Sequence, residues 1–279
     1  MKKIHWKSVT TGNFLALFLI FAVCTGPAVA ENRLIRPGGV YYHRFVSNVD
    51  AAEGLWINPA AIGQAGPIRF LLIGEYADDK LMQSWGGVVS GDRIGIGYRR
   101  LDDYNGGKYE EYTFGTGMGL GHYTFLGGSY TYVKRADDIF NKKHFWNVGL
   151  MIGTSPQMKL GAVLSNLNRS RIDGEKSDIE QVYSISYRPQ KLPVWISVEM
   201  SLSGGQRLSA ADYTYGIEGS PMNRLQVYAG YRDGGQFEVG LTCHFDAYFG
   251  GAQTRFNDES DHLGTSLYGG YLLHPPDKR

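Results

Sequence analysis

Hydrophobic and polar residues alternate along most of the chain. In residues 236–245, QFEVGLTCHF, every second residue is apolar and the residues between are polar or Gly. The same alternation runs through 93–99, 193–201 and 224–232. A repeat of two residues places successive side chains on opposite faces of a strand, whereas a helix repeats about every 3.6 residues. These segments therefore predict β-strands with one apolar and one polar face.

About fourteen segments of this kind follow one another along the chain. They are residues 69–77, 82–90, 93–101, 108–118, 122–135, 142–154, 157–167, 179–188, 193–201, 211–219, 223–232, 235–245, 247–255 and 263–273. A tilted strand needs about 9–11 residues to cross a bilayer, whereas strands of soluble sheets average about five or six. The lengths therefore favour a transmembrane barrel over a soluble β-sandwich.

The connections between these segments alternate in length. Tight ones are predicted at Gly91-Asp92, Gly119 to Gly121, Ser155-Pro156, Pro189 to Leu192, Ser220-Pro221 and Asp246, and longer polar ones at 102–107, 136–143, 168–178 and 257–262. Outer-membrane barrels have short periplasmic turns and longer external loops. The predicted fold is all-β, a transmembrane antiparallel β-barrel of about 14 strands over residues 67–273. An even number of strands leaves both termini on the periplasmic side, with 274–279 as a polar tail.

The N-terminus has the pattern of a secretory signal. Lys2, Lys3 and Lys7 precede an apolar run at 14–23, and Ala-Val-Ala at 28–30 gives a small-x-small cleavage site. The run is too short to span a bilayer, which takes about 20 residues. Residues 1–30 are therefore predicted to be a signal peptide, and an uncleaved anchor helix is the alternative.

The composition is rich in glycine, and the predicted lumenal faces of the strands are charged. The chain has 38 Gly in 279 residues, about twice the usual share. Its 28 Lys and Arg nearly balance 27 Asp and Glu, so nothing indicates a nucleic-acid partner. The polar faces carry charged residues that would point into the lumen: Arg93, Arg99, Glu111, Glu199, Glu218, Arg232 and Glu238. Charges within a membrane are costly, so we expect them to pair or to meet water.

Residues 31–66 form the one long segment outside the predicted strands. Asp50 and Glu53 have the spacing of a capping box, and Asn58-Pro59 places a good N-cap before a good first helical residue. The segment therefore predicts short helical turns that end at Gly63, with apolar Leu55, Trp56, Ile57 and Ile62. Inside a barrel it would form a hatch that closes the pore and packs against the lumenal glycines.

The hatch segment carries a resemblance to a known family. GLWINPAAIG (54–63) resembles the Asn-Pro-Ala hatch motif of the FadL-type fatty-acid channels and of the related PorV/PorQ family. LGAVLSNLN (160–168), 215–245 and HLGTSLYGGY (262–271) resemble later strands of the PorV/PorQ group. The resemblance implies a fourteen-stranded outer-membrane barrel plugged by its N-terminal segment. The matching hatch residues are Trp56, Asn58, Pro59 and Ala60.

Two functions are compatible with this picture. One is a plugged barrel that transports hydrophobic small molecules across the bacterial outer membrane, with membrane lipid as its surroundings. The alternative is a non-conducting scaffold or binding barrel for secreted proteins or a secretion system. The departures from the motif, Ala61 in place of the usual Gly and no long external loops, weigh against fatty-acid uptake.

Enzymatic chemistry is not indicated. Ser260-Asp261-His262 are adjacent in a predicted loop, and adjacency does not make a catalytic triad. The histidines lack zinc-ligand spacing, and GTGMGLG (115–121) continues as strand where a dinucleotide loop would open a helix. We therefore expect no enzyme, metal or cofactor. A lipase that faces the membrane is the third alternative.

Overall fold

The computed structural model describes residues 44–64, 66–77, 80–102, 108–135, 142–172 and 175–273. The predicted signal peptide, the first part of the hatch segment and the polar tail at 274–279 lie outside the described residues. Among the described residues, no helix has the length and apolar character needed to cross a membrane.

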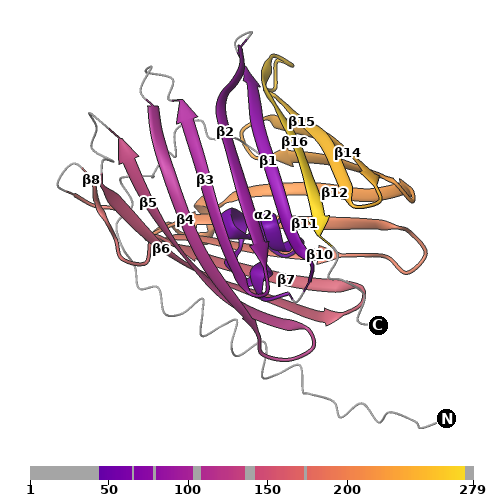
Figure 1. Cartoon of the computed structure of the whole chain (residues 1–279), viewed down its shortest axis with the longest axis horizontal. Coiled ribbons are helices and arrows are strands. Elements are labelled where there is room, and N and C mark those ends of the chain that lie inside the picture. Colours follow the sequence, from indigo (N-terminus) through magenta and orange to yellow (C-terminus); the bar gives the residue numbers. More distant parts are fainter. Residues whose placement is uncertain are drawn as a thin grey trace.

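Fourteen strands form a closed antiparallel barrel, in which each strand pairs with its sequence neighbours and β1 pairs with β16 (Figure 1). The predicted fold class is thereby confirmed. The strands are β1 (Ile68–Ala77), β2 (Lys80–Gly91), β3 (Ile94–Asp102), β4 (Lys108–Gly119), β5 (Thr124–Arg135), β6 (Lys143–Ser155), β7 (Met158–Ser165), β10 (Glu180–Tyr187), β11 (Val194–Ser203), β12 (Asp212–Met222), β13 (Leu225–Arg232), β14 (Gln236–Phe245), β15 (Tyr248–Phe256) and β16 (His262–Leu273). A two-stranded sheet of β8 (Arg171–Ile172) and β9 (Glu175–Lys176) lies in the connection from β7 to β10.

Two predicted boundaries are wrong in detail. Arg93 lies in the turn after β2, at φ 73°, and not in a strand, because Asp92 and Arg93 both adopt positive φ before β3 begins at Ile94. The predicted turn at Ser220-Pro221 lies within β12. The register with β13 shifts between Gly219 and Met222, and such an irregularity accommodates a proline that cannot donate to the ladder.

The two ends of the barrel differ. Short turns at 92–93, 156–157 and 246–247 lie at the end where β1 begins and β16 finishes, since Ile68 pairs with Leu273. The opposite end carries the longest described connections, 166–179 and the segment at 204–211 that contains η2 (Leu208–Ala210), together with a short turn at 233–235. The first and last strands therefore both reach the short-turn end.

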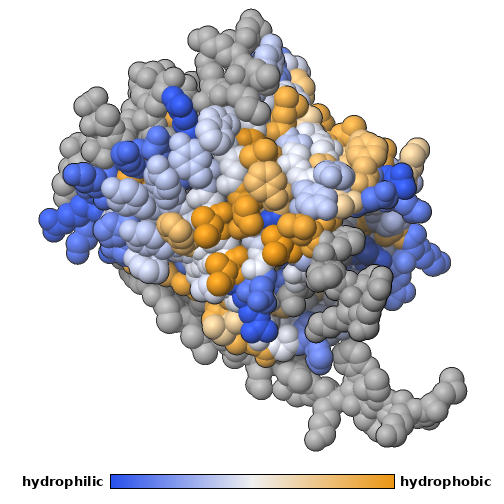
Figure 2. All heavy atoms as spheres, viewed as in Figure 1, coloured by the Kyte–Doolittle hydropathy of each residue, from blue (hydrophilic) through white to orange (hydrophobic). Residues whose placement is uncertain are grey.

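The outer surface of the barrel is apolar near the middle of the strands. Phe114 on β4 and Val239 on β14 are 51% and 50% exposed, although both are hydrophobic. Figure 2 shows apolar side chains gathered across the middle of one face, with hydrophilic side chains towards its margins. An apolar outer band of this kind is typical of a barrel that faces lipid.

Two short helices lie inside the ring of strands (Figure 1). They are α2 (Ala51–Ile57) and η1 (Pro59–Gly63), and their main contacts are with β1–β6. The break between them is at Asn58, whose extended backbone (φ −145°) ends one helix and precedes the next. Ala60 and Ala61 have no exposed surface. The described part of the hatch segment, 44–64, therefore lies within the lumen.

Candidate functional site

Asn58 is the residue that links the parts of the hatch segment. Its side-chain Oδ1 accepts a hydrogen bond from the backbone N–H of Ala60 (3.1 Å), which confirms the predicted N-cap. Its Nδ2 donates to the carbonyl oxygens of Val46 (2.7 Å) and of Leu150 on β6 (3.3 Å). One buried amide thus joins η1, the chain before α2 and the barrel wall.

The predicted capping box at Asp50 and Glu53 is wrong. Asp50 occupies the N-cap position of α2, but its side chain makes no cap hydrogen bond. Its carboxylate instead forms an ion pair with Arg69 on β1, at 2.9 Å. The opposite charge at the start of β1 therefore replaces the helix N–H groups as the partner of Asp50.

The hatch helices rest on a wall of inward-facing glycines. A Cβ at Gly127 on β5 would lie 2.1 Å from the carbonyl oxygen of Pro59, and one at Gly149 on β6 would lie 1.9 Å from Asn58 Oδ1. Both distances are too short for any side chain, so the hatch backbone approaches the strands as closely as glycine allows. We call this surface the glycine wall: Gly95, Gly97, Gly115, Gly117, Gly127 and Gly149.

Apolar side chains fill the space above the glycine wall. Leu55 and Ile62 are 1% exposed, and a Cβ at Gly95 or Gly115 would lie within 3.3 Å of both side chains. Trp56 lies under the guanidinium of Arg99, with Cζ 5.1 Å from the ring centroid. Arg99 in turn donates to Glu111 on the neighbouring strand (Nε to Oε2, 2.9 Å). The predicted lumen residues Arg99 and Glu111 therefore form a pair next to the hatch motif.

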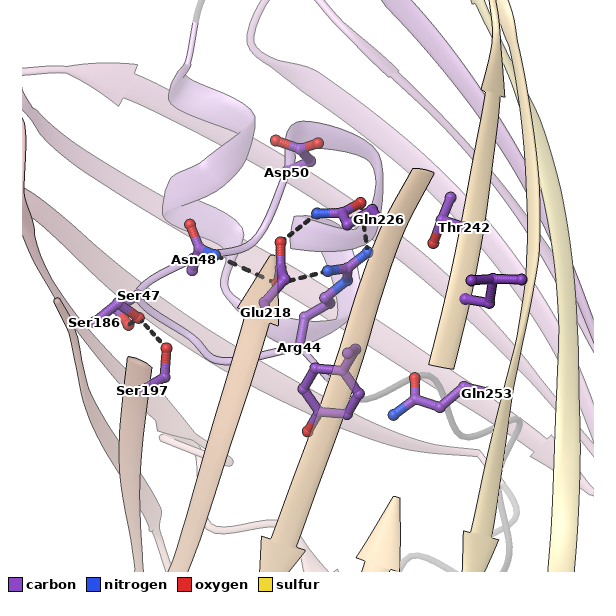
Figure 3. A network of polar contacts seen from close by, with 12 residues as sticks. Arg44, Ser47, Asn48, Asp50, Ser186, Ser197, Glu218, Gln226, Thr242 and Gln253 are labelled. Carbon is purple, nitrogen blue, oxygen red and sulfur yellow. Dashed lines mark hydrogen bonds and ion pairs between the residues drawn. The ribbon is translucent and has the colours of Figure 1, made fainter. Parts of the chain in front are cut away.

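The chain before α2 crosses the opposite side of the lumen. Residues 44–48, which we call the strap, are held there by polar contacts (Figure 3). Arg44 Nη1 lies 2.6 Å from the Oε2 of Glu218 on β12, and Nη2 is 3.5 Å from the side-chain oxygen of Gln226 on β13. Asn48 Nδ2 donates to the same Glu218 oxygen at 3.4 Å. Glu218 thus binds both ends of the strap.

The middle of the strap is bound through its backbone and its small side chains. The N–H of Val46 donates to Glu199 Oε2 at 3.0 Å. The hydroxyl of Ser47 is hydrogen-bonded to Ser184 and, at 2.7 Å, to Ser186 on β10. Phe45 is 1% exposed, and its ring lies 6.2 Å from that of Tyr228. We call this surface the polar wall: Ser184, Ser186, Glu199, Glu218, Gln226 and Tyr228.

The other predicted lumen residues, Glu238, Arg232 and Arg93, differ in location and burial. Glu238 is buried on β14, and its Oε2 accepts from the Tyr228 hydroxyl (3.3 Å) and from Gln253 Nε2 (3.1 Å). Arg232 is partly buried at the far end of β13. Arg93 is exposed in its turn, so it does not project from a strand into the lumen as predicted. It lines a cavity of about 760 Å³ below the hatch, together with Gln64, His122, Phe125, Met151 and Lys159.

Sequence reasoning missed the strap. Arg44 and Ser47 precede the first recognisable motif and lie in a stretch without periodicity. Lys159 also supports the strap, because its Nζ donates to Asn48 Oδ1 at 2.7 Å. A weak signal for Lys159 existed, since it lies on the polar face of a predicted strand.

Comparisons with known proteins agree with this architecture. No family model and no curated protein matches the sequence. The outer membrane protein Omp33 of Acinetobacter baumannii is similar in structure, with a TM-score of 0.52 and 8% identity over 76% of this chain and 100% of that chain. The toluene transporter TbuX of Ralstonia pickettii has a TM-score of 0.57 and 9% identity, over 86% of this chain and 100% of that chain. At these identities the likeness shows the fold, which is that of an outer-membrane β-barrel.

Proposed function

We propose that this protein is a bacterial outer-membrane channel that residues 44–64 close at rest. The observation that carries the proposal is the close seating of the hatch on the glycine wall, where Pro59 and Asn58 leave no room for a Cβ at Gly127 or Gly149. A segment held only loosely in a pore would not need glycine opposite its backbone. The channel admits solute when this segment moves.

The outer surface and the ends of the barrel support the proposed location. The apolar band and the likeness to outer-membrane barrels support an outer-membrane position. The short-turn end, where the first and last strands finish, corresponds to the periplasmic side, to which secretion delivers the chain.

Hydrophobic small molecules are the proposed cargo. The cavity below the hatch includes Phe125, Met151 and Ile152 in its lining, and an apolar solute would gain from their contact. The similar structure TbuX is named a toluene transporter. PorV/PorQ membership remains part of this proposal, on the hatch and strand motifs given above.

Ion conductance across a planar bilayer tests the closed lumen. We expect the full-length protein to stay nearly closed and a variant that lacks residues 31–66 to insert and conduct steadily. Heat-modifiable migration on gels shows beforehand that both variants form barrels. A full-length protein that already conducts like an open porin, or a folded deletion variant that conducts no better than its parent, would refute the plug.

A second candidate is a non-conducting scaffold for secreted proteins or a secretion system. The observation that favours it is the polar seal of the strap, in which Glu199 and Glu218 hold residues 44–48 across the lumen. A scaffold would keep small solutes out under every condition. Long bilayer recordings of the full-length protein distinguish the two, because a channel opens briefly and repeatedly, whereas a scaffold stays sealed until residues 31–66 are removed.

A further inference from the structure

The polar wall binds the strap in a way that a separate molecule could reproduce. The contacts are hydrogen bonds, an ion pair, a ring contact and a close approach of the strap to two glycines, Gly161 on β7 and Gly216 on β12, and all of them involve one short stretch of chain. None of these contacts needs the covalent link to α2. The glycine wall differs, because η1 (PAAIG) has no charged residue, so its close approach to glycine is not accompanied by an ion pair with the strands, as that of the strap is at Glu218.

The chemistry of the polar wall is specific. Glu218 and Gln226 offer two oxygens to the guanidinium of Arg44, a geometry that favours a planar cation. Tyr228 lies against the ring of Phe45, next to this pair. Glu199 accepts a peptide N–H from Val46, and Ser184 and Ser186 meet a hydroxyl.

We propose that the polar wall is a binding site for a cationic peptide that carries an aromatic residue next to its basic one, and that the strap occupies this site as an intramolecular substitute. The wall presents two buried carboxylates, Glu199 and Glu218, so it selects against anions. This inference rests on the proposed function, since displacement of the strap is then the step that opens the lumen.

Tethering explains how the strap holds the site without a high intrinsic affinity. A segment joined by a short linker has an effective concentration in the millimolar range. A free peptide with the same contacts therefore competes poorly with the intact strap. The same peptide should bind well once Arg44 and Phe45 of the strap are replaced by alanine.

The test uses full-length protein in detergent and a labelled peptide with the sequence of residues 44–48, acetylated and amidated. In the double variant R44A/F45A we expect saturable binding by fluorescence anisotropy, at least about tenfold tighter than in the parent. Adding Glu218→Gln to the double variant should weaken binding again. The matched control is Arg255→Ala in the parent, which removes a lumenal arginine that pairs with Glu75 and not with the strap. This control should bind no more peptide than the parent.

A second peptide with Gln in place of Arg controls for nonspecific binding. Equal binding of both peptides, or no binding to the R44A/F45A variant while gels show it folded, overturns the proposal. The assay needs no conductance, so it separates the two claims. If the peptide binds but no variant of the barrel conducts, the channel is refuted and the peptide site stands. If a variant conducts but binds no peptide, the peptide site is refuted and the channel stands.

Discussion

The two sides of the lumen hold the same segment by different means. On the glycine wall, η1 and α2 approach β3–β6 until only glycine fits, and the contact is one of shape. On the other side, the backbone of the strap also approaches one glycine closely, Gly161 on β7, but charges and hydroxyls hold it in addition, above all at Glu218 and Glu199. The first contact rests mainly on shape, whereas the polar groups of the second can also bind water or a solute.

Under the proposed function, this difference predicts where the lumen opens. The dispersion contacts between two closely packed backbones are lost in one step. The polar groups of the strap and of the polar wall can instead bind water one after another as the strap leaves. Local opening takes less free energy than unfolding of the barrel. We therefore expect the strap to leave the polar wall first, while η1 remains seated on the glycine wall.

The largest effect is expected from Arg44→Ala. The substitution leaves the buried carboxylate of Glu218 without its guanidinium, and breaking a buried pair costs about 3–5 kcal/mol. We expect this cost to fall on the seating of the strap, seen as increased conductance in a planar bilayer and as faster amide exchange in residues 44–48. The barrel itself should keep its heat-modifiable migration.

The exposed pair between Arg224 and Asp246 provides the matched control. Its side chains are 70% and 92% exposed, and the charged atoms are 3.6 Å apart. Such a surface pair contributes about 0–1 kcal/mol, so Arg224→Ala should leave conductance unchanged. An equal response of both variants would mean that Arg44 does not hold the strap.

Substitutions on the outer surface should have the same effect behind the glycine wall and behind the polar wall. Phe114→Arg lies outside the glycine wall and Val239→Arg outside the polar wall, and both side chains face outwards near mid-strand. Each charge should cost about 2–4 kcal/mol in a bilayer, measured by denaturant titration of folding into liposomes. The control is Thr242→Ser. The Thr242 hydroxyl is hydrogen-bonded to that of Tyr268 inside the lumen, and serine keeps a hydroxyl, so this substitution should change the folding free energy little. Equal tolerance of the inner and outer changes would contradict the assigned faces.

Gly127→Ala tests the glycine wall directly. Its Cβ meets the backbone of Pro59 at 2.1 Å, and overpacking of this kind costs about 1–3 kcal/mol. We expect the hatch to shift and the conductance to rise. The adjacent Gly128 points outwards, and a Cβ there has its nearest neighbour at 3.6 Å. Gly128→Ala should therefore behave like the parent, and a closed channel in both variants would refute the close seating.

The smallest effect is expected from Asn58→Ala. It removes the cap of η1 and the bonds to Val46 and Leu150, and the loss of an N-cap costs about 0.5–2 kcal/mol. The barrel should insert and fold as before, while the hatch opens more often, seen as brief conductance events. A record as quiet as that of the parent would show that Asn58 does not limit opening.

The sequence was sufficient for the barrel because alternation is a local property. The strands begin and end within a few residues of the predicted ranges, since each inward residue is followed by an outward one. Arg93 was misplaced because no periodicity shows that the chain adopts positive φ at Asp92 and Arg93. Asn58 was predicted as a cap from its position before Pro59, which is again a local signal.

The strap could not be predicted, because its partners are remote in sequence. The hydrogen bond from Arg44 to Gln226 joins residues 182 positions apart. Such a contact depends on the closure of the whole barrel, which brings β12 and β13 to the N-terminal segment. The opposite failure occurred at Asp50, where a local capping pattern gave way to an ion pair with Arg69.

Amide hydrogen exchange of the full-length folded protein tests the central claim most directly, with peptides that cover 44–48 and 55–63. The closed lumen requires that both segments exchange far more slowly than an unstructured chain. The difference between the walls further requires that 44–48 exchange before 55–63. Exchange of both segments at the rate of an unfolded peptide, while the strands stay protected, would contradict a hatch seated in the lumen.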